Sequence, residues 1–178
     1  MQRRNRHKLT AFALTLQLLA CGKNPEEKAA EIGKEVDAAL STQRWEQAEK
    51  KAQEILAIAK ISDATRDQAK LKLEQARSEQ QAKILYQKFS GAAGTDHDGA
   101  IASYRDMAQG SYYRGLAKTE YERILPSYID DHIEKANSAV FNGRCPDAKQ
   151  QLQLVFDVDP QNQKAVELSK KPCPKKPD

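Results

Sequence analysis

Imidazole and carboxylate side chains, which are common catalytic groups and metal ligands, lie close together at Asp130, Asp131, His132 and Glu134. If this stretch is helical, Asp131 and Glu134 share a face and His132 is turned away from them. A metal site needs three or four converging ligands, and the two-histidine spacing of helical zinc sites is absent. We therefore expect a solvated charged face here and no metal ion.

A second group of such side chains, Asp96-His97-Asp98-Gly99, begins like a calcium-binding loop. Ala100 then occupies the next ligand position and no acid closes the loop, so the pattern predicts a turn that caps a helix. The segment 91–94 lacks the lysine and the preceding strand of a phosphate-binding loop. No serine, threonine or cysteine lies in a nucleophile motif. The sequence therefore predicts that the protein is not an enzyme and uses no cofactor.

The N-terminus has the layout of a secretory signal. A basic tip is followed by an apolar run from Leu9 to Ala20, which is too short to cross a bilayer as a permanent helix. The segment Leu18-Leu19-Ala20-Cys21 resembles the lipobox of bacterial lipoproteins. This resemblance implies cleavage directly before Cys21, a diacylglycerol on its sulfur and attachment to a membrane through acyl chains. The alternative is an ordinary secretory signal with an incidental cysteine.

The expected export also bears on the compartment and on the other two cysteines. The residue after Cys21 is Gly22 rather than aspartate, which in the lipoprotein family implies the outer membrane of a Gram-negative cell, with the protein facing the periplasm. Cys145 and Cys173 then remain as one pair in an oxidising compartment, and we expect them to form a disulfide. Closing this loop is worth about 3.5 kcal/mol in the chain-entropy model. Two independent thiols are the alternative.

The charge of the chain excludes nucleic acid as the expected partner. The chain has 29 Lys and Arg against 25 Asp and Glu, and four of the basic residues lie within residues 1–20, so that cleavage leaves 25 of each sign. Binding to nucleic acid would require lysine and arginine collected on one face.

From Lys23 onward the composition predicts helices almost throughout, because alanine, glutamine, glutamate, lysine and leucine dominate and no segment alternates like a strand. Helix starts are indicated at Asn24-Pro25 and Asp159-Pro160, where a capping residue precedes proline. Breaks are expected near 41–42, 62–63, 91–94, 110, 142–143 and 159, which gives roughly seven helices. We expect a cleaved signal at 1–20, a lipidated tether at 21–24, one helical repeat domain at 25–171 and a Pro/Lys-rich tail at 172–178.

Three helix starts, at Trp45, His97 and Cys145, share a sequence frame. In each, an alanine follows three residues later, and larger or apolar residues follow four and seven residues after that alanine. These positions are Ala48, Ala52 and Ile55 in the first segment, Ala100, Tyr104 and Met107 in the second, and Ala148, Leu152 and Val155 in the third. The frame resembles the second helix of the tetratricopeptide repeat, in which the small residue lets two helices pack closely.

This resemblance implies an all-α fold in which antiparallel helix pairs stack as a short right-handed solenoid. The motifs of the first helix of each pair are weak, and the stretches 65–89 and 112–141 are longer than a standard unit. We expect Pro126 to kink or split the second stretch. A terminal helix from Gln161 to Lys170 would follow three degenerate units, stapled back by Cys173.

All six tyrosines lie between Tyr86 and Tyr128. A stripe of apolar residues at helical spacing predicts a core face, at Tyr113, Leu116, Ala117, Tyr121, Ile124, Leu125 and Tyr128. We expect Tyr86, Tyr104 and Tyr112 to reach a concave surface instead and to form the candidate partner-binding site, because tyrosine supplies a large contact area at small entropic cost.

These features predict a lipid-anchored envelope protein that acts as a protein–protein interaction scaffold or assembly factor in a membrane-associated machine. Its partner would be another envelope protein or a peptide segment. Two alternatives stay open at this point. An accessory cell-wall-associated enzyme would need a carboxylate pair in a cleft, and a small-ligand carrier would need a closed apolar pocket.

Overall fold

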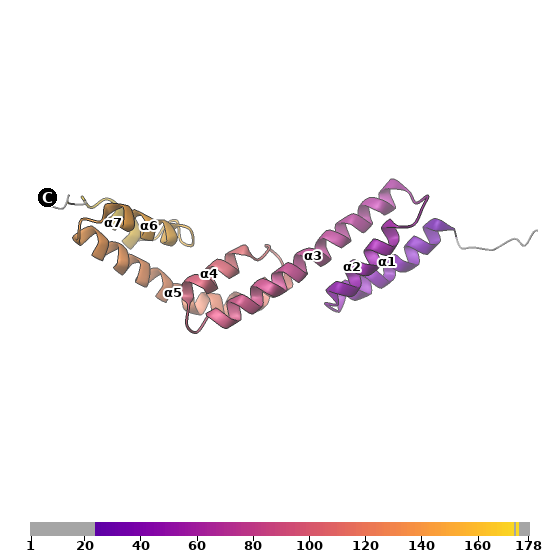
Figure 1. Ribbon diagram of the computed structural model, residues 1–178, viewed down its shortest axis with the longest axis horizontal. Helices are drawn as coiled ribbons and strands as arrows, with labels where there is room; N and C mark the ends of the chain where they lie inside the picture. The colour runs from indigo at the N-terminus through magenta and orange to yellow at the C-terminus, as the bar shows by residue number, and fades with distance from the viewer. Residues whose placement is uncertain (1–23, 173, 175–178) are drawn as a thin grey trace, which may run out of the picture.

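A computed structural model describes residues 24–172 and residue 174, and this part of the chain is all-helical, as expected. The helices form an elongated molecule, with α1 at one end and α6 and α7 at the other (Figure 1). No helix in the described residues is both long enough and apolar enough to span a membrane. The helices are α1 (Pro25–Ser41), α2 (Trp45–Leu56), α3 (Asp63–Ala92), α4 (His97–Asp106), α5 (Tyr112–Phe141), α6 (Cys145–Phe156) and α7 (Gln163–Ser169).

Side-chain caps explain where most of these helices begin. The Asn24 side chain accepts a hydrogen bond from the backbone N–H of Glu26 at 3.1 Å, and Pro25 occupies the first turn. Ser62, Asp96, Ser111 and Asn162 cap α3, α4, α5 and α7 in the same way. The expected capping turn at Asp96 is therefore confirmed, and Asn162 starts α7 two residues later than the sequence suggested.

The turns that join α1 to α2 and α5 to α6 have the same backbone geometry. Gln43 and Gly143 both have a positive φ, of 58° and 69° respectively. The next residue in each turn donates its N–H back to the preceding helix, from Arg44 to the carbonyl of Ala39 at 2.9 Å and from Arg144 to the corresponding carbonyl of residue 139 at 2.8 Å. A positive φ is favourable for glycine and costly for other residues. Two distant parts of the chain thus have the same type of turn, and only the second has glycine at the position of positive φ.

Three apolar clusters follow one another along the molecule. The first joins α1, α2 and the N-terminal half of α3, and its buried residues are mostly alanines. The second joins the C-terminal half of α3 with α4 and the N-terminal half of α5, and contains Phe89, Ile101, Met107 and Ile124. The third joins the C-terminal half of α5 with α6 and α7. The two long helices, α3 and α5, therefore each belong to two clusters.

The positions of the shared sequence frame are all buried. The three alanines, Ala48, Ala100 and Ala148, are at most 4% exposed, and the residues four and seven further on are at most 8% exposed. Each frame also starts at the first residue of its helix, α2, α4 or α6. The small side chain thus lies where the frame helix packs closely against the long helix beside it.

Pro126 does not split α5, which runs unbroken from Tyr112 to Phe141. Proline removes the hydrogen bond to the carbonyl four residues earlier, here that of Glu122. Both residues are exposed, so water can satisfy that carbonyl.

Candidate functional site

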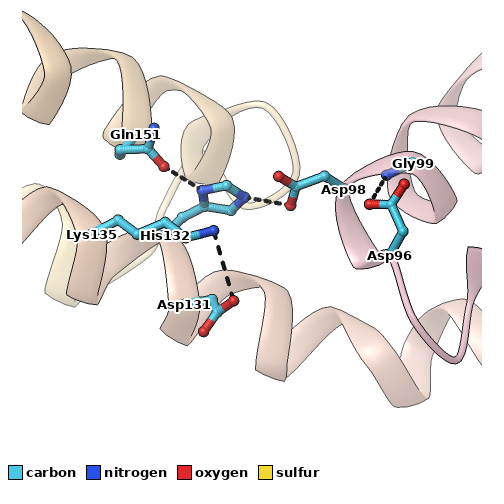
Figure 2. Close-up of polar contacts among 7 residues, drawn as sticks. All are labelled: Asp96, Asp98, Gly99, Asp131, His132, Lys135 and Gln151. Atoms are coloured by element: carbon cyan, nitrogen blue, oxygen red, sulfur yellow. Dashed lines mark hydrogen bonds and ion pairs between the residues drawn. The ribbon is translucent and has the colours of Figure 1, made fainter.

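His132, at the middle of the acidic stretch in α5, is 1% exposed and bridges three helices. Its Nδ1 atom lies 2.7 Å from Oε1 of Gln151 on α6, and its Nε2 atom lies 3.0 Å from Oδ1 of Asp98 on α4 (Figure 2). The Tyr128 ring packs against the imidazole edge-on, with the ring centroids 4.4 Å apart. His132 therefore does not lie on a solvated charged face, as the sequence had suggested, but joins the second and third clusters.

The carboxylates around His132 do not converge on it, apart from Asp98. Figure 2 shows that Asp131 points away from His132 and pairs with Lys135. The Lys135 Nζ atom lies 3.8 Å from Oδ2 of Asp131, and Asp130 pairs with Lys164 of α7 at 3.0 Å. Within the described residues, no three histidine, cysteine, aspartate or glutamate side chains are grouped as metal ligands would be. The buried ring and its two hydrogen bonds thus link α5 to both α4 and α6.

Tyr104 was expected to line a binding surface, and the structure corrects this placement. The residue is 8% exposed and its ring stacks on that of Tyr121, with centroids 3.8 Å apart. The guanidinium of Arg114 lies 4.5 Å from the centroid of the Tyr104 ring. Arg114 also donates to the carbonyl of Met107 at 2.6 Å, at the C-terminal end of α4, where a cation is favourable. Tyr104 thus helps to attach α4 to α5.

Two other tyrosines, Tyr121 and Tyr128, come from the apolar stripe and also belong to the second cluster. Tyr128 is 3% exposed, and Tyr121 is partly buried against Tyr104. Burial, followed by the nearby charge of Asp98, raises the pKa of the Tyr128 phenol, which stays neutral at physiological pH. These residues are core, as the stripe predicted.

Tyr112 differs from the core tyrosines, because 40% of it is exposed at the first residue of α5. Its position is fixed by Glu79 of α3, a buried carboxylate whose two oxygens accept from the Tyr112 N–H at 3.0 and 3.2 Å. A negative charge at this place also favours the N-terminal end of α5. The Tyr112 ring meets that of Tyr113 edge-on, and Tyr113 in turn contacts Tyr86 of α3, with centroids 5.8 Å apart.

Leu116 lies one turn after Tyr112 on α5 and is 48% exposed, although the stripe had placed it in the core. With Tyr86, it lines a hollow of about 270 Å³ between the end of α3 and the start of α5. Tyr86 and Leu116 line this hollow, and Tyr112 lies one helical turn before Leu116 and is linked to Tyr86 through the Tyr113 ring; we call these three residues the α3–α5 surface. Tyr86 and Tyr112, two of the three tyrosines predicted to bind a partner, lie on this surface, and that binding stays a prediction.

The cysteine predictions fall partly outside the described residues. Cys21, the expected lipid attachment site, and Cys173, the expected disulfide partner, are both among the residues that the structure does not describe. Cys145 begins α6 and is disulfide-bonded.

Comparisons of the chain with protein-family models, with curated proteins and with solved structures gave no match.

Proposed function

We propose that the protein is a lipid-anchored envelope protein that binds other proteins through the α3–α5 surface. The observation that carries the proposal is the pair Tyr112 and Leu116, two large apolar side chains about half exposed and one helical turn apart beside a hollow. Neighbouring exposed apolar side chains of this size are typical of interaction sites.

The tyrosines of this surface are held in place before any partner arrives. The rings of Tyr86, Tyr113 and Tyr112 contact one another in sequence, and the Nε1 atom of Trp45 donates to the Tyr113 hydroxyl at 3.3 Å. Glu79 fixes the backbone of Tyr112. Little side-chain freedom would therefore be lost on binding, which raises the affinity that a small contact can reach.

We further propose that the helix pairs α1/α2, α3/α4 and α5/α6 are degenerate tetratricopeptide-like units, stacked as antiparallel pairs in a short right-handed solenoid. The identical turns at Gln43 and Gly143 support this proposal, as do the buried alanines at 48, 100 and 148. In such a repeat array each unit packs mainly on its neighbours, and the three apolar clusters that follow one another along the molecule agree with this packing.

The binding proposal is tested by photo-crosslinking in intact cells. A photoreactive residue at position 116 should capture a defined partner, and adding Tyr112→Ser should reduce that capture about fivefold or more, since truncating a central aromatic contact costs about 1 kcal/mol or more. Leu71 is the matched control, because it is an apolar residue 65% exposed on α3 and outside the α3–α5 surface. Equal capture from positions 71 and 116, or capture that Tyr112→Ser leaves unchanged, would contradict the proposal.

The anchor is tested separately with Cys21→Ser. Acyl chains contribute about 0.8 kcal/mol per buried methylene group, and two chains suffice for stable attachment. The variant should therefore leave the membrane fraction, whereas Cys145→Ser should remain in it. A Cys21→Ser protein that still sediments with membranes after a high-salt wash would refute the anchor.

A further inference from the structure

An apolar hollow of about 330 Å³ is lined by residues of α6, α7 and the last turns of α5. These helices form one end of the molecule (Figure 1). Four large apolar side chains line the hollow, Val140, Leu152, Phe156 and Leu168. Its volume is sufficient for one or two large apolar side chains of a ligand. The hollow is separate from the α3–α5 surface, with which it shares no residue.

Beside this hollow stands the most exposed large apolar side chain of the described residues. Phe141 ends α5 and is 86% exposed. It follows Val140, which lines the hollow, directly in the chain. Phe141 is thus an exposed apolar side chain at the same end of the molecule, but it does not itself line the hollow.

The rim of the hollow is positively charged. Lys149 and Lys171 line it, and Lys170 is adjacent in the chain. None of these three lysines has a carboxylate within ion-pair distance in the described part of the chain. Other cations of α6 and α7 are paired, as Arg144 is with Asp147 and Lys164 with Asp130. Within the part of the chain that the structure describes, no ion pair neutralises the charge of these lysines.

We propose that this hollow binds an acidic segment of another protein that carries a large apolar side chain. The apolar side chain would fill the hollow, and its flanking carboxylates would pair with Lys149 and Lys171. The two obvious competitors match this chemistry less well. The protein's own last residues, 174–178, contain no large apolar side chain, and their two lysines accompany only one acidic side chain, Asp178. A second copy docking by the same face would bring its own lysines against these.

The inference goes beyond the binding function proposed above, because it assigns a second site with a different ligand chemistry. The α3–α5 surface offers tyrosines and a leucine, whereas the hollow combines apolar walls with unpaired cations. A protein with both sites could hold two segments at once, one at the middle of the molecule and one at its end.

The experiment uses a short capped peptide with glutamates on both sides of a leucine–phenylalanine pair, titrated into isotope-labelled protein with its Cys145 disulfide intact. Amide resonances of α6, α7 and the end of α5 should shift, at peptide concentrations up to about 1 mM. The double variant Lys149→Glu with Lys171→Glu should weaken binding about tenfold, because each reversal replaces an attraction by a repulsion. Lys88→Glu, an exposed lysine on α3 without an ion pair in the described residues, is the matched control and should leave binding unchanged.

Each other outcome overturns the inference. Absence of shifts in α6 and α7, equal binding of a peptide with lysines in place of the glutamates, or equal binding by the charge-reversed variant would do so. A dimer in sedimentation that Phe141→Ser dissociates would show that the face joins two copies instead. The protein carrying Tyr112→Ser and Leu116→Ser should bind the peptide like the unmodified chain, so that failure of one site is distinguishable from failure of the other. Far-ultraviolet circular dichroism confirms that all variants are folded.

Discussion

Replacing His132 by alanine removes a side chain that is 1% exposed and hydrogen-bonded to both Asp98 and Gln151. The cavity left by an imidazole costs about 2 kcal/mol. Each lost hydrogen bond costs about 1 kcal/mol, and both partners keep access to water, so neither adds the larger cost of an orphaned buried group. Alanine recovers about 0.5 kcal/mol of helix propensity. The free energy of unfolding should therefore fall by about 3.5 kcal/mol, which lowers the melting temperature by about 10 °C.

The location of the loss is as informative as its size. His132 joins α4, α5 and α6, so hydrogen exchange should accelerate in these helices while α1 and α2, in the first cluster, keep their protection. Urea unfolding followed by circular dichroism gives the total. Lys135→Ala is the matched control from the same helix, because Lys135 forms only an exposed pair with Asp131 and its loss should cost about 0.5 kcal/mol or less.

Two results would refute this reasoning. A His132→Ala protein destabilised by less than about 1 kcal/mol would show that the imidazole is not part of the packing. Equal acceleration of exchange in α1 and α6 would show that the clusters do not unfold separately. Asp98→Ala should fall between the other variants, at about 2 kcal/mol, because it leaves no cavity in the core but leaves the buried Nε2 atom of His132 without its partner.

Three further predictions concern the turns, the loss of stability at acid pH and the disulfide. Gln43→Gly should raise the free energy of unfolding by about 0.5 to 1 kcal/mol in urea titrations, because glycine suits the φ of 58°, and Gly143→Ala should lower it. A less stable Gln43→Gly protein or a more stable Gly143→Ala protein would exclude the shared turn geometry as the cause. The Ser62 N–H and then the Thr65 hydroxyl hold the pKa of Glu26 below its usual 4.5, so this carboxylate contributes stability that is complete above that pH and is lost as the pH falls through the lower, folded value. Melting temperatures measured across the acid range should therefore decline less steeply for Glu26→Gln, and an unchanged slope would reject the assignment. Reduction of the Cys145 disulfide should accelerate hydrogen exchange in α7 and leave α1 unaffected, whereas uniform acceleration, or a free Cys145 thiol in the native protein, would contradict the expected staple.

The helices could be predicted closely from the sequence, because their ends depend on local chemistry. Asn24-Pro25, Ser62 and Asp96 each supply a side-chain oxygen to the first turn, and Gly143 supplies the positive φ that ends α5. Such signals act within a few residues and are legible without knowledge of the tertiary fold. The predicted split at Pro126 was the exception, because an exposed proline is tolerated where water reaches the carbonyl it leaves free.

The contacts of the candidate site were less predictable, because they join helices distant in sequence. His132 follows Tyr128 and precedes Ala136 at intervals of four, which indicates a buried face that the surrounding acids obscured. No nearby sequence pattern indicates that Asp98 and Gln151 are its hydrogen-bond partners. Tyr104 occupies the frame position four residues after Ala100, and that frame already pointed to burial. The exposure of Leu116 depends on where α3 ends, and the spacing of apolar residues along α5 does not predict the end of another helix.

The two shared helices also determine where the chain can be cut. Ala69 and Ala76 of α3 belong to the first cluster, while Phe89 of the same helix belongs to the second. A fragment ending in the loop after α3 would therefore carry a helix whose last three turns had lost their cover, and a fragment ending inside α3 would break the helix itself. The same holds for α5, with Ile124 in the second cluster and Ala136 in the third. Shortened versions of this protein should accordingly aggregate or fray at the cut, and insertions are better placed in the short turns than between clusters.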